Sequence, residues 1–278
     1  MNKNRSLKKI LAFLALTALG TAFGGVPLNS LDGAGGIAFN PLAYNSGLKL
    51  EDSEWFHKPQ VGVWYVKLPE SKIEWSSYSL SLSVADRVEL SYAFNLVDAA
   101  NYGDNSIEAN TIGIKVKLLG ENSFDTSWLP AVAVGVKYRH TDSNTTDIFG
   151  LDDSGFSYYI VATKLITQLP VPLLVSAGLQ RSDEVVYGVV GHNHYGTGLF
   201  ANIDVLPSEN VAVGVEYRQG IDVGDGIENS DYWNGHVAWF VTKQLTLVGA
   251  YVNTGNKNKG FGDLGVGDGL VLSVQYQF

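Results

Sequence analysis

Apolar and polar residues alternate with a period of two along most of the chain. In residues 77–84, a serine stands at every second position between Tyr78, Leu80, Leu82 and Val84. The same alternation recurs in 88–95, 112–118, 132–139 and 211–218. A two-residue period places the two sets of side chains on opposite faces of a β-strand. The pattern therefore predicts a chain built from β-strands.

The less apolar face of these strands carries glycine, alanine, serine and charged residues. Small residues suit the crowded inside of a barrel better than an open, solvated surface. Strands of about ten residues also match the length that crosses a bilayer with tilt, whereas strands of soluble proteins are usually about half as long. We therefore expect an antiparallel transmembrane β-barrel rather than a soluble β-sandwich, which alternates too.

The pattern divides into twelve predicted strands, an even number that is typical of bacterial outer-membrane barrels. Short and long connections alternate, apart from 69–72 and 120–129, so a periplasmic C-terminus would place the long connections outside. The registers of the sixth, tenth and eleventh strands stay open. The predicted strands are 60–68, 73–84, 87–97, 109–119, 130–140, 156–166, 172–182, 196–206, 210–219, 232–242, 244–253 and 268–278. The predicted long loops are 98–108, 141–155, 183–195, 220–231 and 254–267.

The last strand keeps its alternation to the final residue, with Leu270, Leu272, Val274, Tyr276 and Phe278 on one face. Chain termini usually fray and are polar. A strand that closes a barrel faces lipid instead, and an aromatic ring prefers the membrane interface. We expect these five residues to act as the signal that the barrel assembly machinery recognises.

The N-terminus has the layout of a secretory signal peptide. Four basic residues precede the apolar run 10–19, and small residues follow it. We expect cleavage after Ala22. Cleavage removes four of the 19 Lys and Arg and none of the 28 Asp and Glu, which leaves a net charge of −13. This charge disfavours nucleic acid as a partner. Because the chain has no cysteine, it has neither disulfides nor thiolate metal sites.

Residues 23–58 lie between the signal peptide and the predicted barrel, residues 59–278. Their glycines, among them Gly33, Gly35 and Gly36, would let the backbone enter a barrel as a plug. A periplasmic linker or an extra strand is the alternative. The run from Gly35 to Pro41 is similar to the N-terminal hatch of outer-membrane transporters for hydrophobic compounds.

Several stretches resemble an uncharacterised family catalogued as domain of unknown function 3034, whose members are predicted outer-membrane proteins. The resemblance implies the barrel architecture and leaves the activity open. The stretches are DGAGGIAFNPLAY (32–44), DRVELSYA (86–93), WLPAVAVGVKYR (128–139), ATKL (162–165), VGVEYRQ (213–219), WFVTKQLTLVGAYVNTG (239–255) and LVLSVQYQF (270–278).

Charged residues on the inward face are candidates for lining a pore. A basic wall on three successive strands would favour anionic solutes, and it consists of Lys115, Lys117, Lys137, Arg139 and Lys164. Glu89 lies on the preceding strand, within reach of Lys115, while Asp204, Glu216 and Arg218 lie across the barrel. The alternative is a set of buried ion pairs in a narrow interior, and twelve strands alone do not decide between them.

The most favoured function is passive passage of small solutes through the outer membrane, with no cofactor. The partners expected are outer-membrane lipid, lipopolysaccharide, the assembly machinery and an unknown solute. A structural barrel without a pore and uptake of hydrophobic compounds past an N-terminal hatch are alternatives. A barrel phospholipase is a third, because His140 is outward-facing, but no serine is its evident partner. We expect His192 and His194 to lie in a solvated loop, since no third metal ligand is assignable.

Overall fold

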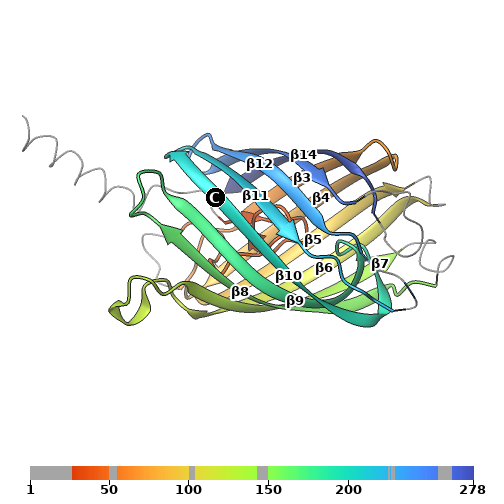
Figure 1. The fold of residues 1–278 in the computed structure, drawn as a ribbon, viewed down its shortest axis with the longest axis horizontal. Coiled ribbons are helices and arrows are strands. Elements are labelled where there is room, and N and C mark those ends of the chain that lie inside the picture. Colours follow the sequence, from red (N-terminus) through yellow and green to blue (C-terminus); the bar gives the residue numbers. More distant parts are fainter. Residues whose placement is uncertain are drawn as a thin grey trace, which may run out of the picture.

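The computed structural model describes residues 27–49, 55–99, 104–142, 150–224, 226, 229–255 and 265–278. Within these ranges, twelve strands form one closed barrel in which each strand pairs with the next and β14 pairs with β3 (Figure 1). The predicted signal peptide, residues 1–22, lies outside the described residues. No described helix is long and apolar enough to cross a membrane, a finding that has no bearing on strands.

All neighbouring strand pairs of the barrel are antiparallel, as expected from the sequence. The strands are β3 Gln60–Leu68, β4 Ile73–Val84, β5 Val88–Ala99, β6 Asp104–Leu119, β7 Ala131–Asp142, β8 Ser154–Ile166, β9 Leu173–Val186, β10 Val190–Ser208, β11 Val211–Arg218, β12 Tyr232–Phe240, β13 Leu245–Asn253 and β14 Asp268–Gln277.

The alternation of the sequence separates an apolar outer surface from the interior. In β4, Tyr78 and Leu80 are 46% and 47% exposed, whereas the serines between them are buried. Strand β14 presents Leu270, Leu272, Val274 and Tyr276 outward in the same way, and Phe278, directly after the strand, is exposed as well. A barrel with this outer surface has its hydrophobic face toward lipid.

The strand prediction is confirmed in number and order, but two predicted loops are wrong in part. Residues 98–108 and 183–195 consist largely of strand, because β5 and β6 extend to Ala99 and from Asp104, and β9 and β10 extend to Val186 and from Val190. In the second hairpin, Asp183 and Glu184 do not lie in a solvated loop, because buried ion pairs satisfy both carboxylates.

The two ends of the barrel differ in their connections. At the end that holds Phe278, here called the terminal end, most turns are short, as between β4 and β5. That turn has Ala85 and Asp86 at φ of 53° and 50°, the two positive φ values of a tight hairpin turn. The connection 120–130 is longer and contains a single 3-10 turn, Ser123–Asp125. The opposite end is called the loop end.

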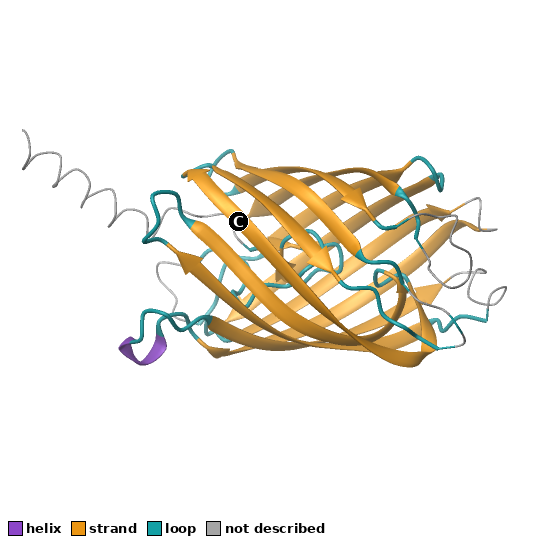
Figure 2. Cartoon of the chain, in the orientation of Figure 1, coloured by secondary structure: helices purple, strands orange, loops and turns teal. Residues whose placement is uncertain are grey.

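Residues 27–49, here called the plug, lie inside the barrel, where the short strands β1 (Leu28–Asn29) and β2 (Gly35–Gly36) pair with each other. Figures 1 and 2 show this segment in the middle of the barrel, surrounded by strands. The plug starts beside Gln60 at the terminal end, where the Pro27 carbonyl accepts a hydrogen bond from Gln60 Nε2 at 3.2 Å. It returns to that end at Gly47, whose N–H donates to Gln60 Oε1 at 3.1 Å.

Candidate functional site

The inward serines of β4 bind the plug through hydrogen bonds. Ser77 Oγ donates to the Leu31 carbonyl at 2.7 Å, and Ser83 Oγ donates to the Ser46 carbonyl at 2.8 Å. Between them, Ser81 Oγ donates to Asn29 Oδ1 at 2.6 Å. Gly33 comes so near β5 that a Cβ there would lie 2.8 Å from the Tyr92 carbonyl oxygen. The small side chains of the wall thus leave room that the plug fills.

An ion pair between Lys115 and Glu89 holds the base of the plug. The two charged groups are 3.0 Å apart and their side chains are each 1% exposed. Glu89 accepts hydrogen bonds from the amides of Gly35 and Ser46, both at 2.7 Å. Lys115 Nζ donates to the carbonyls of Gly35 at 2.9 Å and Tyr44 at 2.7 Å. Each charge therefore meets its opposite and the plug backbone together.

Glu216 of β11 holds the tip of the plug. Its carboxylate accepts hydrogen bonds from three successive plug amides, those of Ala38, Phe39 and Asn40, at 3.0–3.3 Å. The side-chain amide of Asn234 donates to the same carboxylate at 2.6 Å. Successive N–H groups that converge on one anion form a strong binding site for negative charge.

A second polar group lies next to Glu216 on the same side of the barrel. The imidazole of His236 lies 2.7 Å from Asp204 Oδ1 and 2.9 Å from the Asn234 side-chain oxygen. Asn202 also donates to Asp204, at 2.8 Å. Asp204 therefore binds the wall rather than the plug, and Asn234 connects the two groups.

The β9–β10 hairpin bends into the bore. Between Gly191 and Gly196, four residues of β10 face the single residue Asp183 of β9, a bulge that bends the hairpin. The hairpin tip, residues 183–192, is buried, and its Tyr187 reaches Trp75 on the opposite side of the barrel, with ring centroids 6.2 Å apart. The bore therefore contains segments that enter from both ends.

Arginines and a lysine of the wall hold this hairpin tip. Arg139 binds Asp183 through both terminal nitrogens, at 2.9 and 3.3 Å, and Arg218 binds Glu184 at 2.7 Å. Lys137 pairs with Asp32 of the plug and lies 3.8 Å from Glu184. Lys137 thus joins plug, hairpin tip and wall.

The rim of the terminal end has two more charged contacts to the plug. Asp86 lies between Lys117, at 2.6 Å, and Lys49, at 3.0 Å. Burial alone would raise the pKa of the Asp86 carboxyl, but the hydrogen bonds from the two lysines outweigh it and lower the pKa. Glu121 binds Lys164 at 3.0 Å and accepts a hydrogen bond from the Tyr44 hydroxyl at 2.6 Å.

All nine charged residues that the sequence suggested for the lumen have an oppositely charged or hydrogen-bonding partner. The Glu89–Lys115 pair was inferred from neighbouring strands. The partners Asp32, Asp183 and Glu184 were missed, although an apolar run in 185–190 of the supposed loop was a signal that this segment is buried. The residues of the basic wall therefore contact carboxylates and do not present free charge to a solute.

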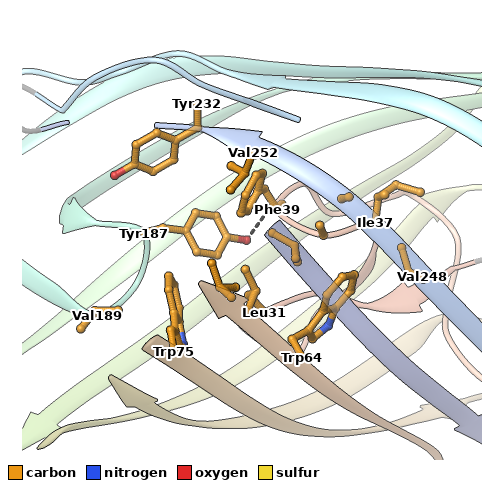
Figure 3. Packing of buried hydrophobic residues seen from close by; sticks show 14 of the residues in the cluster. Leu31, Ile37, Phe39, Trp64, Trp75, Tyr187, Val189, Tyr232, Val248 and Val252 are labelled. Carbon is orange, nitrogen blue, oxygen red and sulfur yellow. Dashed lines mark hydrogen bonds between the residues drawn. The ribbon is translucent and has the colours of Figure 1, made fainter. Parts of the chain in front are cut away.

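Part of the interior is apolar. Buried side chains of every barrel strand except β7 and β8 form one cluster with the plug and the hairpin tip (Figure 3). A cavity of about 30 Å³ remains among them, between Phe39, Trp75, Tyr187 and Tyr232. A second cavity, of about 20 Å³, lies beside Arg218 and has both polar and apolar residues around it. Apolar lumen residues are unusual in a membrane barrel, whose interior is normally polar.

The histidines do not form a metal site in the described part of the chain, where no three His, Cys, Asp or Glu side chains come together for one. His192 is buried, with Nδ1 2.8 Å from the Val223 carbonyl, so its assignment to a solvated loop is wrong. His140 faces outward from β7 as expected. Its cross-strand neighbours are Asn110 and Ser154, but no hydrogen bond between described residues joins the imidazole to either one.

Comparisons with known proteins agree with this architecture. The sequence profile of a family described as "Protein of unknown function (DUF3034)" matches residues 24–266. No curated protein sequence matches significantly. Among solved structures, the KdgM porin is similar with a TM-score of 0.53 and 12% identity, over 79% of this chain and 99% of that one. The NanC porin has a TM-score of 0.52 and 8% identity, over 78% and 100%. Likeness at such identities establishes the fold of an outer-membrane porin.

Proposed function

This chain belongs to the DUF3034 family of proteins of unknown function, and we propose that it is an outer-membrane transport barrel whose bore the plug closes. Passage of a solute requires the plug to leave its contacts. The signal peptide directs export and is cleaved. The terminal end faces the periplasm and the loop end faces outward, as in other outer-membrane barrels.

The observation that carries the proposal is that the barrel wall has small inward side chains where the plug packs against it. Eight-stranded barrels fill their interior with their own side chains, and wider barrels leave space. Here, inward Ser77, Ser81 and Ser83 keep the wall thin where the plug lies, and they bind it through hydrogen bonds. A barrel with a purely structural role would not need a bore so wide that a second segment must fill it.

The polar contacts of the plug support its release. Contacts such as Glu89 with Gly35 and Glu216 with Ala38 are polar, so water can replace both partners once the plug moves. Buried ion pairs contribute little net stability compared with apolar packing of the same volume. A permanently filled interior would gain more from apolar contacts at these positions.

An anion preference is not part of the proposal. Lys115, Lys137 and Arg139 each face a carboxylate, those of Glu89, Asp32 and Asp183. An anion-selective pore needs cationic side chains that the solute reaches. The apolar cluster inside the barrel favours hydrophobic solutes instead, the alternative that the similarity of residues 35–41 to a hatch had suggested.

Deletion of residues 27–49 tests the proposal. We expect the purified variant to conduct in planar lipid bilayers, and the wild-type protein to stay closed most of the time. Folding is checked by the shift in gel mobility on heating, which reports an intact barrel. A folded deletion variant that conducts no more than the wild type would overturn transport and favour the structural alternative.

A disulfide tether tests the same idea without removing the plug. The amide of Ala43 lies 2.9 Å from Thr163 Oγ1, so Ala43→Cys with Thr163→Cys joins plug to wall. Thr163→Cys with Ser176→Cys is the matched control, because these hydroxyls lie 2.9 Å apart on paired strands and the disulfide joins wall to wall. Reduction is expected to restore channel openings in the first variant only, since the chain has no other cysteine. Equal conductance of the oxidised and reduced plug-to-wall variant contradicts the proposal.

The phospholipase alternative has one supporting observation, the row of Asn110, His140 and Ser154 on the outer surface of β6, β7 and β8. A nucleophilic serine requires a base within hydrogen-bond reach, and among the described residues no hydrogen bond joins His140 to Ser154. We therefore expect no fatty acid release when purified protein is incubated with phospholipid and Ca²⁺. Release that is lost in Ser154→Ala would establish the enzyme instead.

A further inference from the structure

We propose that Trp75, Tyr187 and Tyr232 form a binding site for a neutral aromatic ring, and that Phe39 of the plug occupies this site in the closed barrel. The proposal deepens the proposed function and rests on it, because a ligand in this site would displace the plug tip. It names a solute class, small aromatic hydrocarbons and their uncharged derivatives.

The three rings, here called the aromatic cage, come from distant parts of the chain. Trp75 is on β4, Tyr187 is in the hairpin tip and Tyr232 begins β12. The ring of Phe39 lies 5.1 Å from that of Tyr187 at 60°, and 6.3 Å from that of Tyr232 at 50°, measured between centroids. These are the edge-to-face and tilted geometries that aromatic pairs prefer. Figure 3 shows Phe39 beside Tyr187 in the centre of the group.

One side of the cage adjoins an apolar cavity. The adjoining cavity of about 30 Å³ is lined almost entirely by hydrocarbon from the wall, the plug and the hairpin tip. Val66, Leu68 and Val252 contribute to the wall of that cavity. Removal of the Phe39 ring would join its volume to the cavity, and apolar cavities of this kind stay dry and bind benzene-like molecules.

A cationic ligand is disfavoured, although aromatic cages elsewhere bind quaternary ammonium groups. The Arg218 guanidinium already lies over the Tyr187 ring, 4.6 Å from its centroid. Because Glu184 already pairs with this guanidinium at 2.7 Å, a second cation would have to compete with Arg218 for the same ring and the same carboxylate. A neutral ring avoids this competition and keeps the ring contacts that Phe39 makes now.

Phe39 also connects the cage to the polar anchor of the plug. Its amide donates to Glu216, and its carbonyl accepts a hydrogen bond from the Tyr187 hydroxyl. A ligand ring that takes the place of the Phe39 ring therefore strains both backbone contacts. Binding in the cage and release of the plug tip are consequently coupled.

Direct binding tests the site with fluorobenzene as the probe, followed by ¹⁹F NMR in detergent micelles. We expect Phe39→Ala to bind fluorobenzene at least about tenfold more tightly than wild type. Phe200→Ala is the matched control, because Phe200 is also a buried phenylalanine, 1% exposed, but belongs to a different apolar cluster. Binding by Phe39→Ala no tighter than that by wild type or by Phe200→Ala overturns the proposal.

A second measurement keeps the plug intact. Ala38 is 1% exposed, so Ala38→Cys is expected to react slowly with a maleimide in the cysteine-free chain. Fluorobenzene should accelerate the labelling several-fold, and tetramethylammonium should not. An equal effect of both probes overturns the neutral-ring assignment, and no effect of fluorobenzene overturns the competition. The two proposals can fail separately. If Phe39→Ala binds fluorobenzene but the variant lacking residues 27–49 does not conduct, the aromatic site is supported and transport is rejected.

Discussion

Two lysine–glutamate pairs of similar length differ in how much stability is lost when one partner is removed, because only one pair is buried. Lys115 and Glu89 are 3.0 Å apart at 1% exposure, whereas Lys67 and Glu74 are 2.7 Å apart with both side chains more than half exposed. Loss of one partner from a buried pair leaves an unpaired charge and costs about 3–5 kcal/mol. We expect Lys115→Met to lower the free energy of unfolding by that amount, measured by urea titration of tryptophan fluorescence in micelles.

Lys67→Met is the control, and no measurable change is expected because water solvates Glu74 once the lysine is gone. The double variant Lys115→Met with Glu89→Gln should recover part of the loss, since it removes the unpaired carboxylate. Equal losses of unfolding free energy in Lys115→Met and Lys67→Met would contradict the larger contribution expected of the buried pair.

The sequence allowed some of these residue pairs to be predicted and not others. Glu89 and Lys115 lie on adjacent strands, so alternation and strand order alone bring them together. Asp32 and Lys137 are 105 positions apart, and their contact depends on the path of the plug inside the barrel. No periodicity specifies that path, because the glycine-containing segment suits a plug and a linker equally.

At the scale of elements, strand alternation predicted the wall, but it placed the ends of two hairpins too early, those of β5–β6 and β9–β10. The outer surface must be apolar in every strand, so the period of two persists wherever lipid is the neighbour. In the hairpin tip, both faces meet protein, and Asp183 with Glu184 breaks the pattern. Their partners Arg139 and Arg218 lie on other strands, so local sequence made a buried segment resemble a solvated loop.

In the turn between β4 and β5, Asp86 pairs with Lys49 at the end of the plug. The contribution of the Asp86 charge to stability depends on pH. Asp86 has a pKa lowered by Lys117 and Lys49 against the effect of burial. Its stabilising contribution is therefore complete above the ordinary aspartate pKa of about 4 and disappears as the pH falls through the lowered value. We expect Asp86→Asn to have a lower urea midpoint than wild type at pH 7, and the difference to shrink at pH 2. A difference that stays constant across this range contradicts the role of the Asp86 charge.

At the scale of the whole molecule, closure of the barrel pairs its last strand with its first barrel strand, β3. Strand β14 pairs with β3 along its length, and the Phe278 amide donates to the Pro59 carbonyl at 3.1 Å. The Phe278 side chain does little for this closure, because its ring is 55% exposed and packs on Tyr276, with centroids 5.3 Å apart. A terminal ring that contributes so little to the folded barrel suits recognition before folding.

Truncation of Phe278 separates the two roles. We expect the truncated chain to refold into detergent micelles with a urea midpoint close to that of the full chain, because the β14–β3 pairing is retained. In cells, it should accumulate in the periplasm and be depleted from outer-membrane fractions, since the assembly machinery lacks its signal. Phe278→Tyr keeps an aromatic ring and should insert normally. Normal insertion of the truncated chain would reject the assembly signal, whereas failure to refold in micelles would show that Phe278 acts through barrel closure.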